Sequence, residues 1–562
     1  MPPLRRLLAA LRPPGAGLPL LLGAVFLLTG LGWAQLLDWD ENIYAEVARQ
    51  MVQRGEYVAP VLNGHPFVEK PPLVLWEMAA AFHLLGVNEV AARLPSALGG
   101  VALLAFLVWA GRRLVDAPLG WAWALVYGST LIPLVFGRSA VIDHTFNGLM
   151  AAGAFLLLLY DRARERFLTG GAPRRTHWAL LGAASVAMGL AVLAKGPLGG
   201  VVPLVAFGGA KLVRRRPGIH PGHFAFCAAL SLAVGLSWYA ANFLRAGEAF
   251  LEGFARFQGL LLSRPLEGHR GPFWYHFGAV LVGFFPWTPL LLLYALRDVR
   301  RALWADRATR ELLALCGAWL AFVLVLFSFV QTKLPHYSSS AYLPLALLAA
   351  LALERLRRQG RAVPRWAAVL LAGYGALVGG LVLALPAFAE RLAADAGAAL
   401  EHPPQLSPWA FLPGAALVLG TAVGALWLAR GRLRPGAVAV AVAAGLFVVG
   451  LWRFHLPLVV AYNQGPVLTL MRQAYATGGD LVLYRHVSFA VLFYGGRDVE
   501  MLHTYKFPGD PGLLDAPGPR PRYVISPRAE VERLRREHPR VAPVRELGRL
   551  ALLRLPARDE AP

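Results

Sequence analysis

The sequence predicts an all-helical polytopic membrane protein that ends in a small α/β domain. Three observations carry this prediction. The 562 residues are 57% hydrophobic and only 16% charged, which is unlike an ordinary soluble domain. Apolar runs long enough to cross about 30 Å of hydrocarbon as helices recur along most of the chain. The C-terminal part instead alternates short strand-like and helical runs.

Thirteen apolar runs are expected to form transmembrane helices. The first follows Arg5, Arg6 and Arg12 but is too long for a cleaved signal, so it is expected to remain as a helix. Gly196 and Pro197 separate the sixth run from the one before it. By residue number, the thirteen runs are 18–37, 96–114, 118–136, 140–160, 178–194, 197–213, 224–244, 273–296, 311–330, 337–353, 366–386, 409–429 and 436–456.

The distribution of charge orients these helices. The formal net charge is +22, and alternate loops such as ARERFLTGGAPRRTH and KLVRRRP are basic. Basic loops stay on the cytoplasmic side, so the N-terminus is expected in the cytoplasm and the C-terminal domain outside the plasma (inner) membrane. The charge therefore indicates contact with anionic membrane lipids and not binding to nucleic acid.

Two parts of the chain extend beyond the helices. The first outer segment, 38–95, is longer than a connection needs to be and contains two amphipathic stretches, NIYAEVARQMVQRG and PLVLWEMAAAFHLLG, which are expected to lie along the membrane surface as helices. The transmembrane domain is predicted over 1–460. The soluble α/β domain is predicted over 461–562, with strands at LVLYR, RYVISP and LALLRL.

Three carboxylates on the predicted outer face are candidates for catalysis. Asp40 and Glu41 follow the first helix directly, and they could equally serve as first-turn acids of the surface helix. Asp143 lies in a largely apolar run, where an ionisable residue is a functional candidate by default. None of the three signals is specific alone.

Lys70 is the sharpest candidate for binding a phosphate. Pro71 and Pro72 force an extended entry into the following helix and hold the adjacent Glu69 and Lys70 in a fixed turn. A lysine near the membrane surface can bind phosphate as a point charge. Snorkelling to the head groups is the ordinary alternative for any one lysine. Four more basic residues of outer segments could assist: Lys195, Arg264, Arg270 and Lys333.

The sequence requires no cofactor, but a divalent metal is possible. Glu69 with His269 forms the first candidate ligand pair. No two of the outer histidines show the local spacing of metal ligands, so a metal depends on tertiary proximity. His65, His144 and His336 are the other outer histidines. The chain has no Gly-rich phosphate loop and no nucleophile elbow, which argues against a nucleotide-binding or serine-hydrolase function.

Taken in order, these segments resemble one known family along nearly the whole chain. It is the bacterial family that transfers 4-amino-4-deoxy-L-arabinose from undecaprenyl phosphate to lipid A. The dolichyl-phosphate-mannose protein mannosyltransferases are a more distant resemblance. The matching residues are Asp40-Glu41, Tyr44-Ala45-Glu46, Asn63-Gly64, Glu69-Lys70-Pro71-Pro72, Arg93-Leu94-Pro95-Ser96, Arg138, Asp143, Lys195-Gly196-Pro197, His269-Arg270, Trp274-Tyr275, Pro286-Trp287, Lys333-Leu334-Pro335 and Tyr337.

The resemblance implies a C-type glycosyltransferase fold and a polyprenyl-phosphate sugar donor used on the outer side. Lys70 would bind the donor phosphate, with Arg270, Arg264, Lys333 and Tyr337 in support. Asp40 would be the first candidate for general base, followed by Asp143 and Glu41. The acceptor would attack from the opposite face of the sugar and invert its configuration.

The acceptor remains open. A lipid such as lipid A or another cell-envelope glycolipid is the first expectation, and Ser or Thr of exported proteins is the alternative. Ser338, Ser339 and Ser340 stand where relatives are more apolar, and the SRPLEGHRGPFWY stretch differs in spacing from theirs. A transporter or flippase ranks lower because the charged candidates gather at helix ends and not at the bilayer midplane. A monomer is expected.

Overall fold

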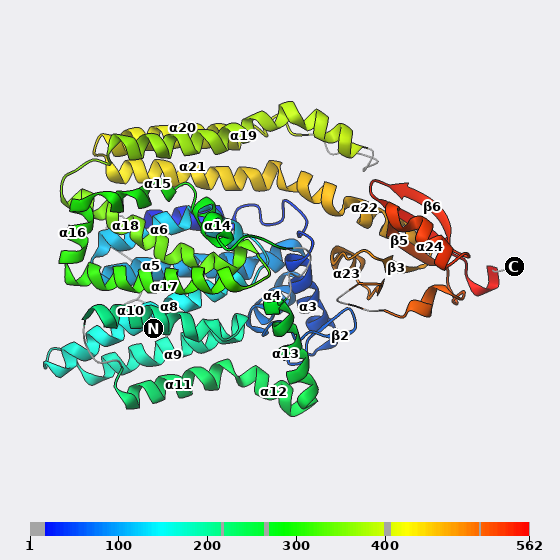
Figure 1. The fold of residues 1–562 in the computed structure, drawn as a ribbon, viewed down its shortest axis with the longest axis horizontal. Coiled ribbons are helices and arrows are strands. Elements are labelled where there is room, and N and C mark those ends of the chain that lie inside the picture. The colour runs from blue at the N-terminus through cyan, green and yellow to red at the C-terminus, as the bar shows by residue number, and fades with distance from the viewer. Residues whose placement is uncertain are drawn as a thin grey trace.

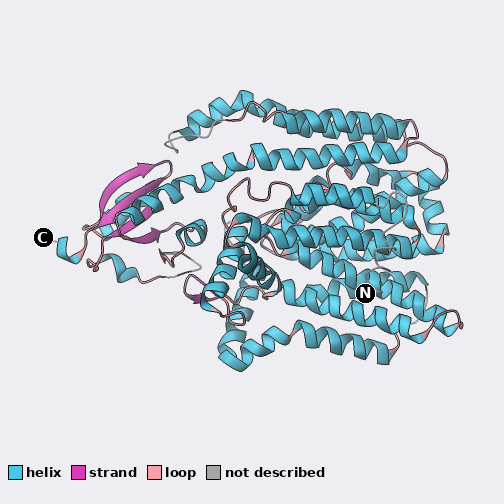
Figure 2. Ribbon diagram, turned by 180° about the vertical axis from the view of Figure 1, so that it is seen from behind, coloured by secondary structure: helices cyan, strands magenta, loops and turns pink. Residues whose placement is uncertain are grey.

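The computed structural model describes residues 17–214, 219–263, 269–397, 406–504, 507 and 509–560. Most of them form a bundle of helices, and the strands gather beyond one end of that bundle, which we call the sheet end (Figures 1 and 2). The helical elements of the bundle are α2 (Gly17–Leu28), α5 (Glu89–Leu114), α6 (Ala117–Gly128), α7 (Leu131–Gly137), α8 (Asp143–Leu168), α9 (Arg174–Lys195), α10 (Leu198–Arg214), α11 (Pro221–Gly235), α12 (Ser237–Ala246), α13 (Glu248–Ser263), α14 (Tyr275–Gly283), α15 (Thr288–Leu291), η2 (Leu292–Ala295), α16 (Arg297–Ala305), α17 (Arg307–Phe329), η3 (Pro335–Ala341), α18 (Tyr342–Arg358), α19 (Arg365–Gly397), α20 (Leu412–Ala429), α21 (Leu433–Phe454) and α22 (Leu456–Ala476).

The chain is a multi-pass membrane protein, although thirteen spans are not found. Within the described residues, seven helices are long and apolar enough to cross a membrane, or up to ten if each bent pair of helices counts as one span. Three predicted runs are such pairs: α6 with α7, bent by 73°, α11 with α12, bent by 49°, and α14 with α15 and η2, bent by 109°. The run predicted at 18–37 contains only the 12-residue α2. Hydropathy measures how apolar a run is, and it does not detect where the helix bends.

Glycines allow close helix crossings inside the bundle. Where α5 crosses α6, a Cβ on Gly111 would lie 2.5 Å from Cα of Gly120. Such a contact is impossible for any larger residue at this position. In membranes, where lipid tails remove the hydrophobic drive between helices, small residues of this kind let backbones pack by van der Waals contact.

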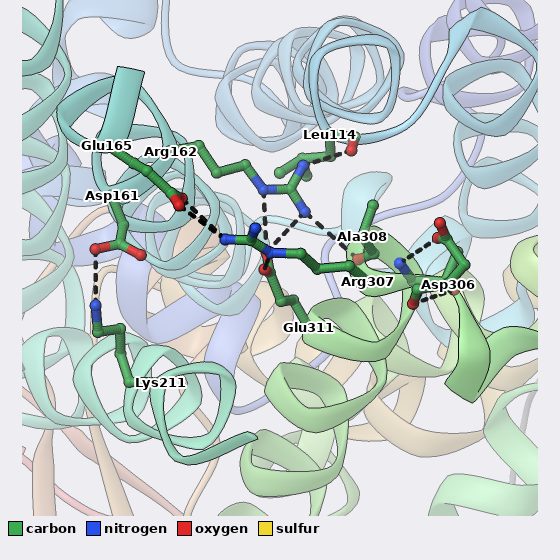
Figure 3. A network of polar contacts seen from close by, with 10 residues as sticks. Leu114, Asp161, Arg162, Glu165, Lys211, Asp306, Arg307, Ala308 and Glu311 are labelled. Carbon is green, nitrogen blue, oxygen red and sulfur yellow. Dashed lines mark hydrogen bonds and ion pairs between the residues drawn. The ribbon is translucent and has the colours of Figure 1, made fainter. Parts of the chain in front are cut away.

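A network of ion pairs joins the helix ends farthest from the sheet. The C-terminal part of α8, the N-terminal end of α17 and the end of α10 meet there (Figure 3). The contacts are Lys211 Nζ to Asp161 Oδ1 at 2.8 Å, Arg162 Nη2 to Glu311 Oε2 at 3.0 Å, Arg307 Nη2 to Glu165 Oε1 at 3.0 Å, and Arg162 Nη1 to the Leu114 carbonyl at 2.5 Å. Pairing is what makes charged side chains tolerable at partly buried positions.

The segment between α2 and α5 contains the two helices that its sequence predicts. They are α3 (Asp40–Arg54) and α4 (Leu73–Leu85), with a small hairpin of β1 (Val61–Leu62) and β2 (His65–Pro66) between them. Helix α3 is more enclosed than a surface helix, because every residue from Glu41 to Met51 is buried. The sequence pattern alone predicted that this helix lies along the membrane surface.

The C-terminal part forms a mixed five-stranded sheet in the order β4-β3-β5-β7-β6. β3 is parallel to β4 and β5, whereas β7 is antiparallel to β5 and β6. The boundary predicted at residue 461 falls inside α22, and the first strand starts at Asp480. The elements are β3 (Asp480–Tyr484), α23 (Ala490–Gly495), β4 (Glu500–Leu502), η4 (Pro511–Leu514), β5 (Arg522–Pro527), η5 (Arg528–Glu530), α24 (Val531–Glu537), β6 (Ala542–Leu547), β7 (Leu550–Leu555) and η6 (Arg558–Glu560).

The sheet region is hydrogen-bonded to the segment between α2 and α5. Asp38 Oδ1 accepts hydrogen bonds from the backbone N–H groups of Phe489 and Ala490 at the start of α23, at 2.8 and 3.0 Å. Asn63 exchanges two hydrogen bonds with the backbone of Val499, at 2.7 and 2.8 Å. Both contacts bind parts of the chain that are more than 400 residues apart. They fix the backbone on either side of α3.

Candidate functional site

A cavity of about 310 Å³ lies at the sheet end of the bundle, between α8, the α9–α10 junction, α13, α17 and η3. It combines charged, polar and apolar walls, as small-molecule sites usually do. The lining residues are Lys70, Asp143, Phe146, Asn147, Met150, Lys195, Gly196, Pro197, Leu198, Val202, Gln258, Val323, Leu326, Phe327, Val330, His336, Tyr337, Ser339 and Ser340.

A larger groove, of about 960 Å³, opens between α2, α6, α20 and α21. Its lining is almost entirely apolar, and Arg434 is the one charged residue among the groups that border it. The guanidinium lies 5.9 Å from the centroid of the Trp121 ring. Without a carboxylate or a second cation this groove can hold a lipid chain but offers no groups for catalysis. The smaller cavity is therefore the candidate active site.

An ion pair between two helix ends forms one wall of the cavity. Lys195, the last residue of α9, donates a hydrogen bond from Nζ to Oδ1 of Asp143, the first residue of α8. Gly196 then turns the chain with φ 116°, a backbone conformation that favours glycine, and α10 follows. The ammonium also lies 5.8 Å from the Phe146 ring and 5.9 Å from the Tyr337 ring. The two opposite charges thus neutralise each other beside the aromatic rings of Phe146 and Tyr337.

Lys70 enters the cavity from the turn before α4, as its double proline predicts. Pro72 is the residue that precedes the helix, and Leu73 begins it. The ammonium lies 5.5 Å from the Phe257 ring centroid, and the described part of the chain offers it no ion pair within hydrogen-bond distance. Burial lowers the pKa of Lys70, and the nearby Lys195 lowers it further against the opposing charges of the carboxylates around it. An anion bound here would oppose both effects and raise the pKa of Lys70, because a nearby negative charge favours the protonated ammonium.

Asp40 begins α3 and is not itself a lining residue of the cavity, but it lies close enough for its charge to act on this group of residues. Its charge acts on Lys70 and, with those of Asp143 and Glu69, on Tyr44. Burial raises the pKa of Tyr44, and the three carboxylates raise it further. Among the described residues no hydrogen bond to the Asp40 side chain is found, so both its oxygens can accept from a bound molecule. Near the Lys195–Asp143 ion pair, the described residues therefore include one cation without an ion-pair partner, Lys70, and one carboxylate without a hydrogen bond, Asp40.

Glu41 does not belong to this group. Its carboxylate accepts hydrogen bonds from Nε and Nη2 of Arg93, both at 2.9 Å, and from the backbone N–H groups of Leu37 and Ala140, at 2.8 and 2.7 Å. Burial acts to raise its pKa, but the charge and hydrogen bonds of Arg93 and the two backbone donors prevail and lower it. With its lone pairs occupied and only 3% of its surface exposed, Glu41 holds the fold together and does not face the cavity.

The other predicted phosphate ligands are placed differently from Lys70. Lys333 donates from Nζ to the carbonyls of Phe327 and Ser328, at 3.0 and 2.7 Å, and so covers the C-terminal end of α17. It is not among the residues that line the cavity. Arg270 is exposed and does not border the cavity either. Arg264 lies outside the described residues, whereas Tyr337 lines the cavity as predicted.

The predicted metal ligands are not gathered into one site. Within the described ranges, no three His, Cys, Asp or Glu side chains are close enough together to hold a metal ion. His269 is exposed, and it binds Lys333 only through its backbone carbonyl. His65 stacks on Phe507, 5.4 Å between ring centroids. His144 is buried in the core and His336 lines the cavity. Glu69 contributes charge beside Lys70.

Several lining residues were absent from the predicted site. Asn147 lies four residues after Asp143, and this helical spacing would have identified it as a neighbour on the same face. Ser339 and Ser340 stood out only as a departure from relatives. Gln258 comes from α13, and no sequence pattern connects that helix with α8.

Comparison with known proteins places the chain among lipid-linked sugar transferases. The sequence profile of the dolichyl-phosphate-mannose-protein mannosyltransferase family matches residues 24–244. An undecaprenyl phosphate-α-4-amino-4-deoxy-L-arabinose arabinosyl transferase of Pseudomonas aeruginosa is 30% identical over 440 residues, which cover 76% of this chain and 73% of that protein. Its counterpart in Pectobacterium carotovorum is 31% identical over 347 residues, 59% of this chain and 57% of that protein. The match thus spans less than two thirds of the length of the Pectobacterium relative.

Solved structures share the fold. ArnT from Cupriavidus metallidurans bound to undecaprenyl phosphate has a TM-score of 0.75 at 22% identity, covering 97% of this chain and 98% of that one. The apo oligosaccharyltransferase of Archaeoglobus fulgidus has a TM-score of 0.51 at 14% identity, covering 92% of this chain and 69% of that one. At such identities the likeness shows the fold alone, and it agrees with the predicted C-type glycosyltransferase architecture.

Proposed function

Because the chain belongs to the family of undecaprenyl phosphate-α-4-amino-4-deoxy-L-arabinose arabinosyl transferases, we propose that it transfers a sugar from a polyprenyl phosphate to a lipid acceptor such as lipid A. One observation carries the proposal most directly. Lys70 presents an ammonium that has no ion-pair partner among the described residues, and the cavity it lines also contains one carboxylate, Asp143, and several neutral polar side chains. An ammonium of this kind needs an anion, and the phosphate of the donor supplies it.

The donor phosphate would bind at Lys70 and leave its sugar in the cavity. The residues after Pro72 form the apolar helix α4, so the lysine stands where an apolar helix meets a polar site. A lipid phosphate approaches a membrane protein at such a boundary, with its tail in the bilayer. The Cupriavidus relative of similar fold was solved with undecaprenyl phosphate, which supports a polyprenyl phosphate as the donor class.

The reaction would be a single displacement at the anomeric carbon. The bond between this carbon and the phosphate oxygen breaks, and its electron pair stays on the oxygen, so polyprenyl phosphate leaves as an anion beside Lys70. An acceptor oxygen forms the new bond from the opposite face, which inverts the configuration. If the acceptor is a hydroxyl, its proton passes to a carboxylate; if it is a phosphate oxygen, no proton needs to be removed.

Asp40 is the stronger candidate for that carboxylate. Asp143 already accepts the hydrogen bond of Lys195, and this ion pair weakens it as a base. The Asp40 side chain has no such partner among the described residues. We therefore assign proton removal, or orientation of a phosphate acceptor, to Asp40. Asp143 and Lys195 would then remain paired with each other beside the sugar.

The proposed location is the bacterial inner membrane, with the sheet end outside the cytoplasm. The basic loops of the sequence favour this orientation. Cysteine accessibility from either side of sealed vesicles would test it.

The test is transfer by the purified protein in lipid, with polyprenyl-phosphate sugars as donors and lipid A as acceptor. Lys70→Met is expected to lower kcat by at least about 100-fold, the usual effect of losing one group that stabilises the leaving charge. Lys333→Met is the matched control, because within the described residues the ammonium of Lys333 binds only carbonyls of the last turn of α17; its activity per folded molecule should stay near that of the parent.

Two outcomes would contradict the proposal. Equal loss in both variants would remove the special role of Lys70. Transfer to peptides of exported proteins and not to lipid would favour the protein mannosyltransferase alternative, for which the profile match over residues 24–244 is the support.

A further inference from the structure

The wall of the cavity contains an amide oxygen to which no described residue donates a hydrogen bond. Asn147 is 4% exposed and borders the cavity. Its Nδ2 donates to Oγ of Ser339 at 2.9 Å, while its Oδ1 is buried and accepts no hydrogen bond from any residue that the structure describes. Buried carbonyl oxygens are almost always satisfied, so one that is not requires an explanation. A bound molecule with an O–H or N–H group would provide the missing donor.

The position of Asn147 says which part of a substrate it meets. It lies four residues after Asp143 on α8, hence on the same face and about 6 Å farther along the helix. Asp143 is at the sheet end of α8, so Asn147 is deeper in the bundle. The chemistry proposed above takes place beside Lys70 and Asp143. A sugar whose anomeric carbon lies there would direct the opposite side of its ring toward Asn147.

The deep wall is polar but carries no carboxylate. Ser339 accepts from Asn147, and Ser340 accepts from Trp319 Nε1 at 3.3 Å. Among the cavity-lining residues, Asp143 is the single carboxylate, and it is paired with Lys195. The apolar residues Met150, Val202 and Val323 complete this part of the lining. Such a wall favours a substrate that places a hydrogen-bond donor at Asn147 and uncharged groups against the rest of the surface.

We propose that Asn147 Oδ1 accepts a hydrogen bond from a hydroxyl or amino group of the donor sugar, at the ring carbon opposite the anomeric carbon, and so selects the sugar that is transferred. Ser339 is a positioning residue that keeps the amide turned toward the cavity. This inference rests on the proposed function. It adds the residue that would recognise the group on that ring carbon.

The experiment compares three polyprenyl-phosphate pentoses that carry a hydroxyl, an amino group or hydrogen at that ring carbon. The parent protein should use the first two with a kcat/KM at least about tenfold above the deoxy donor, because a site built for a hydrogen bond rejects an analogue that lacks it. Asn147→Leu should abolish this preference. Asn147→Asp keeps an acceptor oxygen and adds a charge, so it should favour the amino donor over the hydroxy donor.

Matched controls separate a substrate contact from a structural role. Ser185→Ala removes a buried hydroxyl of α9 that donates to the Leu181 carbonyl at 2.7 Å and does not line the cavity, so it should leave the preference unchanged. A loss in Asn147→Leu that is equal for all three donors would show that Asn147 only supports the fold. An unchanged preference in that variant would also overturn the inference.

Donor binding keeps the two proposals distinguishable. Thermal stabilisation by each donor is compared with that by polyprenyl phosphate alone, since a ligand that binds only the folded state raises its stability. Lys70→Met should weaken binding of all these ligands, whereas Asn147→Leu should remove only the advantage that the sugar adds. Binding of polyprenyl phosphate with no such advantage in the parent would overturn the role of Asn147 and leave the proposed function standing. No binding of polyprenyl phosphate at all would overturn both.

Discussion

Replacing Glu41 by glutamine tests whether this carboxylate supports the fold or takes part in the reaction. The carboxylate binds Arg93 through two hydrogen bonds and accepts two more from backbone N–H groups. Glutamine has nearly the same shape but only one acceptor oxygen. Its NH₂ group would point at a donor, either a guanidinium or a backbone N–H. The substitution therefore removes a charge and creates a clash between donors.

The expected loss of stability is large because both partners are buried. The side chains of Arg93 and Glu41 are 0% and 3% exposed. Removing one member of a buried, hydrogen-bonded ion pair costs about 3–5 kcal/mol. Such a loss lowers the ratio of folded to unfolded protein by a factor between about 10² and 10⁴, since 1.36 kcal/mol corresponds to a factor of ten. Arg93 also donates to the carbonyls of Leu31 and Ala34, so the loop after α2 should loosen as well.

Glu56→Gln is the matched control. Glu56 also accepts from two backbone N–H groups, those of Val58 and Ala59, and pairs with an arginine, Arg245. Its side chain is 39% exposed and that of Arg245 is 53% exposed, so the same substitution should cost only about 1–2 kcal/mol. Thermal inactivation in lipid gives the stability of each variant, and turnover per folded molecule gives its activity.

Acidification adds a second measurement. The pKa of Glu41 is lowered in the folded protein, so its contribution is complete above the ordinary value of 4.5 and is lost as the pH falls through the folded pKa. Glu41→Gln should therefore flatten part of the acid limb of the stability profile. A variant with parental stability and turnover reduced by more than 100-fold would refute this reasoning, because it would show that Glu41 acts in the chemistry.

Three further changes have expected outcomes. In Lys70→Arg, the fall of donor kcat/KM on the alkaline side should move to higher pH, because the pKa of Lys70 is below 10.5 while a guanidinium stays protonated; a pH–rate profile measures it. Asn63→Ala should loosen the sheet region, because both hydrogen bonds to Val499 are lost at a residue with φ 53°; hydrogen exchange of β4 should rise at least about fivefold. Asp161→Asn should cost about 3–5 kcal/mol of stability by leaving Lys211 buried without its counter-charge, with turnover of the folded protein unchanged.

The sequence predicts the features that depend on local physics. The double proline before Leu73 places Lys70 in a turn ahead of a helix, and that helix begins where expected. The break between Lys195 and Leu198 is also found. Each follows from backbone geometry within a few residues, so no knowledge of tertiary contacts is needed.

The role of each charged residue depends on contacts that the sequence does not contain. Asp40 and Glu41 are adjacent in sequence and equally acidic. A helix directs successive side chains about 100° apart, so the charge of Asp40 acts on Lys70 while Glu41 meets Arg93, 52 residues away. Tertiary contacts decide which of two neighbouring carboxylates forms an ion pair. Hydropathy and residue spacing do not reveal these contacts.

The same argument explains why Lys70 and Lys333 look alike in sequence and differ in the fold. Both precede prolines at the ends of apolar helices. Lys333 follows α17 closely enough to reach carbonyls of its last turn, which helices leave without intrahelical partners, and these satisfy the ammonium. Lys70 precedes α4, where a helix offers N–H groups and no free carbonyl, so it finds no local acceptor. Whether a lysine precedes or follows a helix therefore helps decide whether its ammonium is bound by backbone carbonyls or is free to bind a ligand.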